Sequence, residues 1–182
     1  MNIEQTFIKD LVILTPKIFE DERGSFFEAY NQAKCNQNGI DYQFIQDNQS
    51  FSKRGVIRGL HLQISPFAQA KLVRVLEGEI LDVVVDLRKK SPTFGKHFSM
   101  ILSAENKKQL MVPHGFAHGF SVLSVTASVI YKVEQVYHKE SERGIRYDDP
   151  TLAIDWRLDA NEIIVSEKDL ILPSFDEIDW EF

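Results

Sequence analysis

Apolar and polar residues alternate with a period of two along most of the chain, and patterns with the helical period are few. The clearest case is a hairpin whose arms are residues 71–76 and 80–87, with Glu77-Gly78-Glu79 as the turn. In the second arm Asp82 and Asp86 fall on one face, and the other face is apolar, with Leu81, Val83, Val85 and Leu87. This pattern predicts a half-buried antiparallel strand.

Other segments alternate in the same way. They predict strands at residues 11–14, 25–30, 44–48, 56–63, 98–102, 109–112, 119–123 and 127–137. Residues 31–39 predict a short helix that ends at Gly39, and one or two short helices are expected near Ser166. Many short strands with turn signals about every 8–12 residues indicate an all-β sandwich or closed barrel. No linker, low-complexity tract or repeat divides the chain, so residues 1–182 are expected to form a single domain.

Composition narrows the class of protein. The chain of 182 residues has 43% hydrophobic and 26% charged residues, which is ordinary for a soluble domain. Its net charge of −6 argues against non-specific nucleic-acid binding. Cys35 is the only cysteine and there is no secretion signal, so we expect a cytoplasmic protein. No apolar run approaches the roughly 20 residues that span a bilayer, so no membrane partner is expected.

His61 is the first candidate for chemistry, in Arg58-Gly59-Leu60-His61-Leu62-Gln63. A histidine within a strand is more often a hydrogen-bonded structural group than a catalyst. Imidazole is nevertheless the side chain best suited to proton abstraction near neutral pH, and Arg58 and Gln63 argue against a purely apolar setting.

The segment Pro113-His114-Gly115-Phe116-Ala117-His118-Gly119-Phe120 adds further histidines, which raises the question of a metal site. A catalytic zinc or iron site commonly needs three side-chain ligands. Metal-binding barrels often carry two histidines spaced by one residue on their first strand, but Gln63 occupies the second of these positions here. The metal-site interpretation therefore lacks a ligand.

Tyr131 shares a strand face with Val129, Val133 and Tyr137 by parity, whereas Lys132 and Glu134 fall on the opposite face, which we expect to be solvated. An inward tyrosine is most often part of the core, but across a cavity from a base it can be a general acid. Arg23, Arg58 and Lys71 lie at strand ends, where cations are usually solvated. If they converged in one cavity they would suit a diphosphate or an enolate.

Ser166-Glu167-Lys168-Asp169 matches the pattern found at the start of a helix, and its simplest interpretation is a capping box. The chain has no glycine-rich dinucleotide or P-loop motif and no Gly-x-Ser-x-Gly elbow.

Six segments, taken in order, resemble those of dTDP-4-dehydrorhamnose 3,5-epimerases. They are Asp21-Glu22-Arg23-Gly24, Gln46-Asp47-Asn48, Arg58-Gly59-Leu60-His61, Ser91-Pro92-Thr93-Phe94-Gly95, Leu102-Ser103-Ala104-Glu105-Asn106 and Phe116-Ala117-His118-Gly119-Phe120. The resemblance runs from about residue 7 to 175. It implies a cupin-type double-stranded β-helix (jelly roll) with a few short peripheral helices, and an enzyme without metal or other cofactor. It also implies a homodimer with exchanged N-terminal strands.

The resemblance implies a role for each candidate. His61 is the base, Tyr131 the opposing proton donor, Asp169 the carboxylate that holds the histidine ring, and Lys71 the cation near the sugar's O4. The reaction would be 3,5-epimerisation of a nucleotide-linked 4-keto-6-deoxyhexose, dTDP-4-keto-6-deoxyglucose to dTDP-4-keto-rhamnose, through an enolate. Arg23 could act in the neighbouring subunit's site. The substrate-binding positions are Arg23, Glu28, Gln46, Asp47, Asn48, Arg58, His118, Tyr137, Glu142 and Lys168.

The chain departs from the family pattern at Val136-Tyr137, where the family usually has two adjacent tyrosines, one of which stacks on the nucleobase. We expect Tyr137 to keep the stacking role. The nucleotide base is the least specified part of this interpretation. The alternatives are a 3-epimerase or another epimerase acting on a different nucleotide-linked 4-keto sugar, a metal-dependent cupin, and a non-catalytic sugar-binding module.

Overall fold

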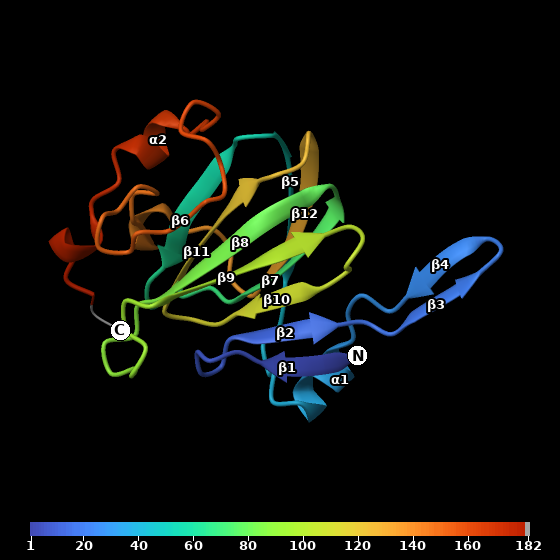
Figure 1. Ribbon diagram of the computed structural model, residues 1–182. Coiled ribbons are helices and arrows are strands. Elements are labelled where there is room, and N and C mark those ends of the chain that lie inside the picture. Colours follow the sequence, from blue (N-terminus) through green and yellow to red (C-terminus); the bar gives the residue numbers. More distant parts are fainter. Residues whose placement is uncertain (181–182) are drawn as a thin grey trace.

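The computed structural model describes residues 1–180, and two antiparallel sheets face each other across its core (Figure 1). The six-stranded sheet contains, in spatial order, β1 (Asn2–Gln5), β2 (Val12–Thr15), β10 (Gln109–Val112), β7 (Lys71–Glu77), β12 (Thr126–Val133) and β5 (Gln46–Lys53). The five-stranded sheet contains β13 (Glu142–Gly144), β6 (Ile57–Gln63), β11 (Phe116–Val122), β8 (Glu79–Asp86) and β9 (His97–Ser103). The predicted all-β jelly roll is confirmed.

The helical elements are short and lie outside the sheets. They are α1 (Gln32–Gln37), α2 (Glu167–Leu170) and the 3₁₀ turns η1 (Lys139–Ser141) and η2 (Phe175–Glu177). Asn31 caps α1 by accepting a hydrogen bond from the Lys34 amide, and Gly39 lies just beyond it with a φ of +78°. Ser166 caps α2 in the same way. Both helices predicted from the sequence are therefore confirmed.

Several strand boundaries differ from the sequence pattern. β1, β3 (Ile18–Asp21) and β13 were not predicted, and β5 continues to Lys53. β12 ends at Val133 rather than at Tyr137, because Val133 pairs with the first residues of both neighbouring strands, Gln46 and Lys71. Just beyond Val133 the described chain has no partner strand, so alternation along β12 does not determine the direction of the Tyr137 side chain.

The main core lies between the sheets, and a second core lies outside the five-stranded sheet. The inner core includes Val73 and Val129 from one sheet and Ile80, Val84 and Phe120 from the other. On the outer side of β8, Leu81, Val83, Val85 and Leu87 pack against the C-terminal part of the chain, including Leu152, Trp156 and Trp180. The prediction of a half-buried strand is therefore wrong: residues 80–86 are all buried, and Asp82 and Asp86 face the interior.

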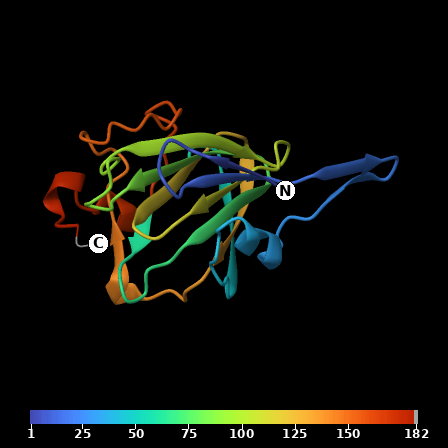
Figure 2. The ribbon, with the colours of Figure 1, turned by 90° about the horizontal axis from the view of Figure 1, so that it is seen from below.

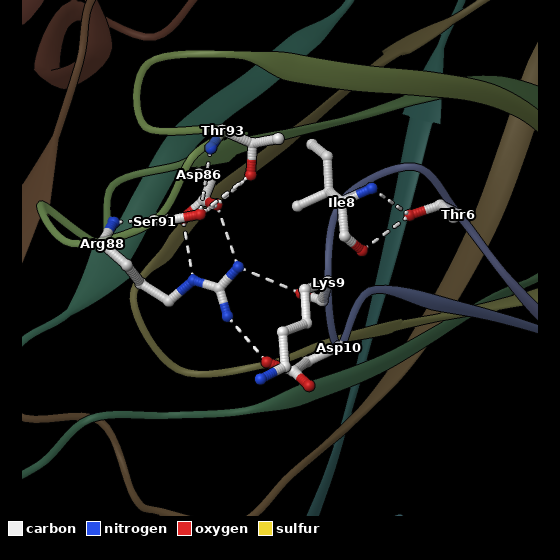
Figure 3. Close-up of polar contacts among 8 residues, drawn as sticks. All are labelled: Thr6, Ile8, Lys9, Asp10, Asp86, Arg88, Ser91 and Thr93. Carbon is white, nitrogen blue, oxygen red and sulfur yellow. Dashed lines mark hydrogen bonds and ion pairs between the residues drawn. The ribbon is translucent and has the colours of Figure 1, made fainter.

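The end of β8 anchors the N-terminal segment (Figure 3). Arg88 donates to both carboxylate oxygens of Asp86, with Nε–Oδ1 at 2.8 Å and Nη2–Oδ2 at 2.9 Å. The same guanidinium donates to the Asp10 carboxylate at 2.9 Å and to the Lys9 carbonyl at 3.0 Å. This clamp holds the loop before β2 against the barrel, where Ile8 enters the core.

A two-stranded hairpin of β3 and β4 (Gly24–Phe27) extends away from the body of the molecule (Figures 1 and 2). It carries two large apolar side chains on its surface, Phe19 with 54% exposure and Phe26 with 74% exposure. Arg23 lies at the hairpin turn, where it donates to Asp21. No helix of the described residues is long and apolar enough to cross a membrane.

Candidate active site

His61 lies in β6 and forms the centre of the site. Its Nε2 is 2.7 Å from Oδ1 of Asp169, which is buried. Burial raises the pKa of Asp169, but the His61 hydrogen bond and charge, an amide hydrogen bond from Gly59 and Ser166 lower it by more, so the net pKa lies below the ordinary value. With Nε2–H donated to this carboxylate, Nδ1 of the ring is left free to accept a proton.

Backbone pairing brings Asp169 to His61 across 108 positions of sequence. Ile164 forms a parallel bridge with Val56, its carbonyl accepts from the Ile57 amide at 2.9 Å, and its amide donates to the Gly55 carbonyl at 2.9 Å. Ser166 then starts α2, and its hydroxyl accepts from the Asp169 amide at 3.2 Å. The predicted helix start is confirmed, and the carboxylate it positions bonds to the histidine.

Tyr131 approaches the same cavity from β12, in the opposite sheet. Burial raises the pKa of its hydroxyl above the ordinary value, and the positive charge of Arg58 acts in the opposite direction. A tyrosine in this state holds its proton at neutral pH. The cavity measures about 450 Å³, and its polar and charged lining consists of Ser50, Arg58, His61, Lys71, His118, Tyr131, Ser166, Lys168 and Asp169.

Lys71, the first residue of β7, places its ammonium at this cavity. Its Nζ makes a long contact of 3.4 Å with the carbonyl oxygen of His61. Burial lowers the pKa of Lys71 to about 8, against the charges of Asp82 and Glu142, which raise it. At neutral pH this ammonium is a cation inside the site.

His118 lies beside His61 because β6 and β11 pair antiparallel with these two residues in register. Two glycines allow the close approach. Gly59 has a φ of +121°, and a Cβ at Gly119 would lie 2.7 Å from the Arg58 carbonyl oxygen. His118 Nε2 is 2.9 Å from Oδ2 of Asp82, and both side chains are buried.

A second cavity of about 250 Å³ adjoins the first, and His61, Lys71 and Tyr131 line both. Its other polar lining residues are Gln46, Asn48, Gln63, Gln69, Tyr137 and Glu142. Glu142 accepts from the Tyr137 hydroxyl at 2.8 Å and from Lys168 Nζ at 2.5 Å. Tyr137 lines this cavity from the chain that follows β12, and the residue is 58% exposed.

Gln63 occupies the position where metal-binding barrels often carry a histidine, and here its amide is committed to the backbone. It donates to the carbonyls of Phe67 and Val136 and accepts from the His138 amide at 2.7 Å. These bonds tie the chain after β6 to the chain after β12. Among residues 1–180 no three His, Cys, Asp or Glu side chains gather closely enough to hold a metal ion.

Three predicted binding residues lie outside both cavities. Asp47 alternates with Gln46 and Asn48 on β5, so it faces the other side of the sheet, where it pairs with Lys132 at 2.9 Å. The same side was expected to be solvated, but the Lys132 side chain is only 28% exposed and the Glu134 side chain 14%. Arg23 lies on the protruding hairpin.

Glu28 follows that hairpin and bonds to Lys34 and Asn31 on the surface. Neither Arg23 nor Glu28 lines a cavity with His61 in the same chain.

Sequence reasoning did not identify Asp82 as a site residue. The available signal is a charged residue within a strongly apolar strand, a pattern that predicts a half-buried strand. Asp82 faces the barrel interior because the C-terminal segment covers the other face of β8. The cavity also has apolar walls that were not predicted, namely Val56, Ile57, Phe120, Ile164 and Val165.

Comparison with known proteins identifies the family and the fold. Residues 5–177 match the family model described as dTDP-4-dehydrorhamnose 3,5-epimerase. The chain is 48% identical over 181 residues to the protein of that name from Shigella flexneri, covering 99% of each chain.

Solved structures are similar over the whole fold. The dTDP-4-dehydrorhamnose 3,5-epimerase of Elizabethkingia anophelis is 52% identical with a TM-score of 0.93, and the match covers 97% of each chain. A Legionella pneumophila 3,5-epimerase, solved in complex with dTDP-4-keto-L-rhamnose, is 50% identical with a TM-score of 0.93. That match covers 98% of this chain and 94% of the other.

Proposed function

The chain belongs to the dTDP-4-dehydrorhamnose 3,5-epimerase family, and we propose that it inverts C3 and C5 of dTDP-4-keto-6-deoxyglucose with His61 as the base. It is an isomerase by this membership. The single observation that carries the residue roles is that His61 and Tyr131 line one cavity from opposite sheets. Family membership gives no support to a metal-dependent cupin or a non-catalytic sugar-binding module.

The chemistry gives each of these side chains a task. The protons at C3 and C5 are acidic because the C4 ketone can hold the resulting enolate charge. Inversion needs removal of a proton from one face of the ring and its return from the other face, so base and acid must oppose each other. His61, held by Asp169, takes the proton, and Tyr131 returns one from the opposite side. The Lys71 ammonium stabilises the negative charge that develops on O4.

The second cavity provides a place for the nucleotide. Gln46, Asn48 and Glu142 line it beside the catalytic residues. Tyr137 is half-exposed at its edge and offers a ring face for a base, which is the stacking role expected from the sequence. Arg58, His118 and Lys168 line the main cavity beside His61, where they offer hydrogen bonds to the sugar and to the diphosphate that joins it to the nucleoside.

We propose that the enzyme is a cytoplasmic homodimer in which the β3–β4 hairpin reaches the partner's site. The hairpin leaves the body of its own chain (Figure 2). Phe19 and Phe26 are exposed on it, and a second copy would cover them. In that arrangement Arg23 and Glu28 serve the neighbouring cavity, which accounts for their distance from His61 in one chain.

Solvent exchange tests the reaction. The wild-type protein is incubated with dTDP-4-keto-6-deoxyglucose in D2O, and deuterium is followed at C3 and C5. Label at both carbons supports 3,5-epimerisation, and label at C3 alone indicates the 3-epimerase alternative. Absence of exchange by wild type, or full exchange by His61→Ala, would contradict the proposal.

Mixed dimers test the hairpin. His61→Ala and Arg23→Ala chains, each impaired alone, are unfolded together, refolded and assayed. If Arg23 acts in the partner's site, one site of each mixed dimer contains both native residues and activity returns. Activity no higher than that of the separate variants would overturn the exchange. Light scattering must also give twice the mass of one chain.

A further inference from the structure

Asp82 combines complete burial with an incomplete set of hydrogen bonds. It lies in the middle of β8 with no exposed surface. Its Oδ2 bonds to His118, whereas Oδ1 has no hydrogen-bond partner in the described structure. A buried carboxylate oxygen without a partner is costly, so its retention calls for a physical explanation.

Lys71 lies in the opposite sheet and lines the main cavity together with His118, the partner of Asp82. By strand parity, Lys71 shares a face of β7 with Val73, and Asp82 shares a face of β8 with Val84. Both of these valines lie in the core between the sheets.

Among the charges that act on the buried Lys71 ammonium, Asp82 contributes most to keeping it protonated, ahead of Glu142. Burial acts strongly in the other direction and brings the pKa of Lys71 to about 8. Loss of the Asp82 charge would lower that pKa further and increase the fraction of neutral amine at physiological pH.

The other ionisable groups around Lys71 do not offer a free anion. Those lining the two cavities with it are Arg58 and His61 on β6, His118 on β11, Tyr131 on β12, Tyr137 after β12, Glu142 on β13, and Lys168 and Asp169 on α2. Asp169 is committed to His61, and Glu142 to Lys168 and Tyr137. Glu142 is also partly exposed to solvent, whereas Asp82 is fully buried and keeps one oxygen without a hydrogen bond among the described residues.

We propose that Asp82 is a positioning residue of the epimerisation, which orients His118 with one oxygen and keeps the Lys71 ammonium charged with the other. A charged ammonium stabilises an enolate oxygen, whereas a neutral amine does so far less. The inference rests on the proposed function, since Lys71 has an enolate to stabilise only if the substrate carries a ketone.

The test compares two buried aspartates of the same strand. Asp82→Asn and Asp86→Asn are assayed with wild type for kcat and kcat/KM from pH 6 to pH 10. In wild type, kcat should decrease on the alkaline side of the profile with a midpoint near pH 8, the pKa of Lys71. We call this decrease the alkaline limb. In Asp82→Asn the limb should move down by about one pH unit or more, the size of shift produced by an adjacent opposite charge.

Asp86→Asn is the matched control, because its partners lie at the other end of β8. It should keep the wild-type limb even if it melts at a lower temperature. A folded Asp82→Asn protein with the wild-type limb would overturn the proposal, because a merely structural aspartate would not affect the titration of Lys71.

A second measurement needs neither a variant nor substrate. The carbon-13 shift of the Asp82 carboxylate, followed by NMR in wild type, should show an inflection near pH 8 as Lys71 loses its proton. No inflection there would overturn the coupling even if Asp82→Asn failed to fold. This signal does not depend on turnover, so it tests the coupling of Asp82 and Lys71 by itself. Failure of the proposed function would appear in a different experiment, as no deuterium exchange at C3 and C5.

Discussion

The strand β8 uses the same side chain in opposite ways at two positions: Asp86, at what we call its anchoring end, and Asp82, in the middle of the strand toward what we call its catalytic end. Asp86 and Asp82 are both fully buried and face the interior of the barrel. Both carboxylate oxygens of Asp86 have hydrogen-bond donors, so the group is saturated. It accepts from Arg88, and it also accepts hydrogen bonds of 2.6 Å from the Ser91 and Thr93 hydroxyls (Figure 3). Asp82 has one partner and one unpaired oxygen. A saturated carboxylate anchors the fold, whereas an unsaturated one beside a cavity leaves its charge available to the site.

The consequence for titration differs as well. Burial raises the pKa of Asp86, but hydrogen bonds from Arg88, Ser91 and Thr93 lower it by more, so its net pKa lies below the ordinary value of 3.8. Near Asp82 the titration that changes is that of Lys71, whose pKa burial lowers to about 8. We therefore expect substitutions at the catalytic end to change the reaction and those at the anchoring end to change stability.

The largest effect is expected at the catalytic end. His61→Asn keeps a donor for Asp169 but removes the base, so kcat should fall by about 10²–10⁴-fold, the usual contribution of general base catalysis. Thermal unfolding should change less than in the anchoring variants below. The checks are label uptake in D2O and a melting curve, and a variant that retains more than a tenth of wild-type turnover would contradict the role of His61.

Arg88→Ala should have the largest effect at the anchoring end. It leaves the Asp86 carboxylate buried without its cation, and breaking a buried pair from one side costs about 3 kcal/mol of unfolding free energy. Urea unfolding measures this loss. At a temperature where the variant is folded, its kcat should match wild type, and a large loss of kcat would mean that the two ends of β8 are not independent.

Asp86→Asn should show a smaller and pH-dependent effect. At pH 7 the loss of charged hydrogen bonds should cost about 2 kcal/mol. A carboxyl with a lowered folded pKa stabilises the fold above its unfolded pKa and loses that contribution as pH falls through the folded pKa. The difference in melting temperature between wild type and variant should therefore narrow below about pH 4. A constant difference from pH 7 to pH 3 would argue against the charge of Asp86 as its source.

Tyr137→Phe should produce the smallest change. It removes the hydroxyl that donates to Glu142 but keeps the ring, so a stacking role predicts a KM within about threefold of wild type, less than 1 kcal/mol. Tyr137→Ala should raise KM more than Tyr137→Phe does, with kcat little changed. Equal KM values for the two variants would argue against stacking.

Alternation identified most of the strands because side chains on a strand point to opposite faces, whatever the fold. It separated Leu81 from Asp82 correctly but could not say which face was inside. That depended on the C-terminal segment with Trp156 and Trp180, which covers the apolar face and leaves the aspartates toward the barrel interior. The β12 boundary depended in the same way on where the neighbouring strands begin.

The sequence by itself determined the strand pattern, the residue types that can exchange protons, and, through six ordered segments, the family. Only the tertiary structure decided which of those residues meet. The pairing of Asp169 with His61 and the approach of Tyr131 from the facing sheet are long-range contacts that local periodicity does not encode. The same is true of Asp82. Its hydrogen bond to His118 depends on the pairing of β8 with β11, and its charge acts on Lys71, which the opposite sheet carries.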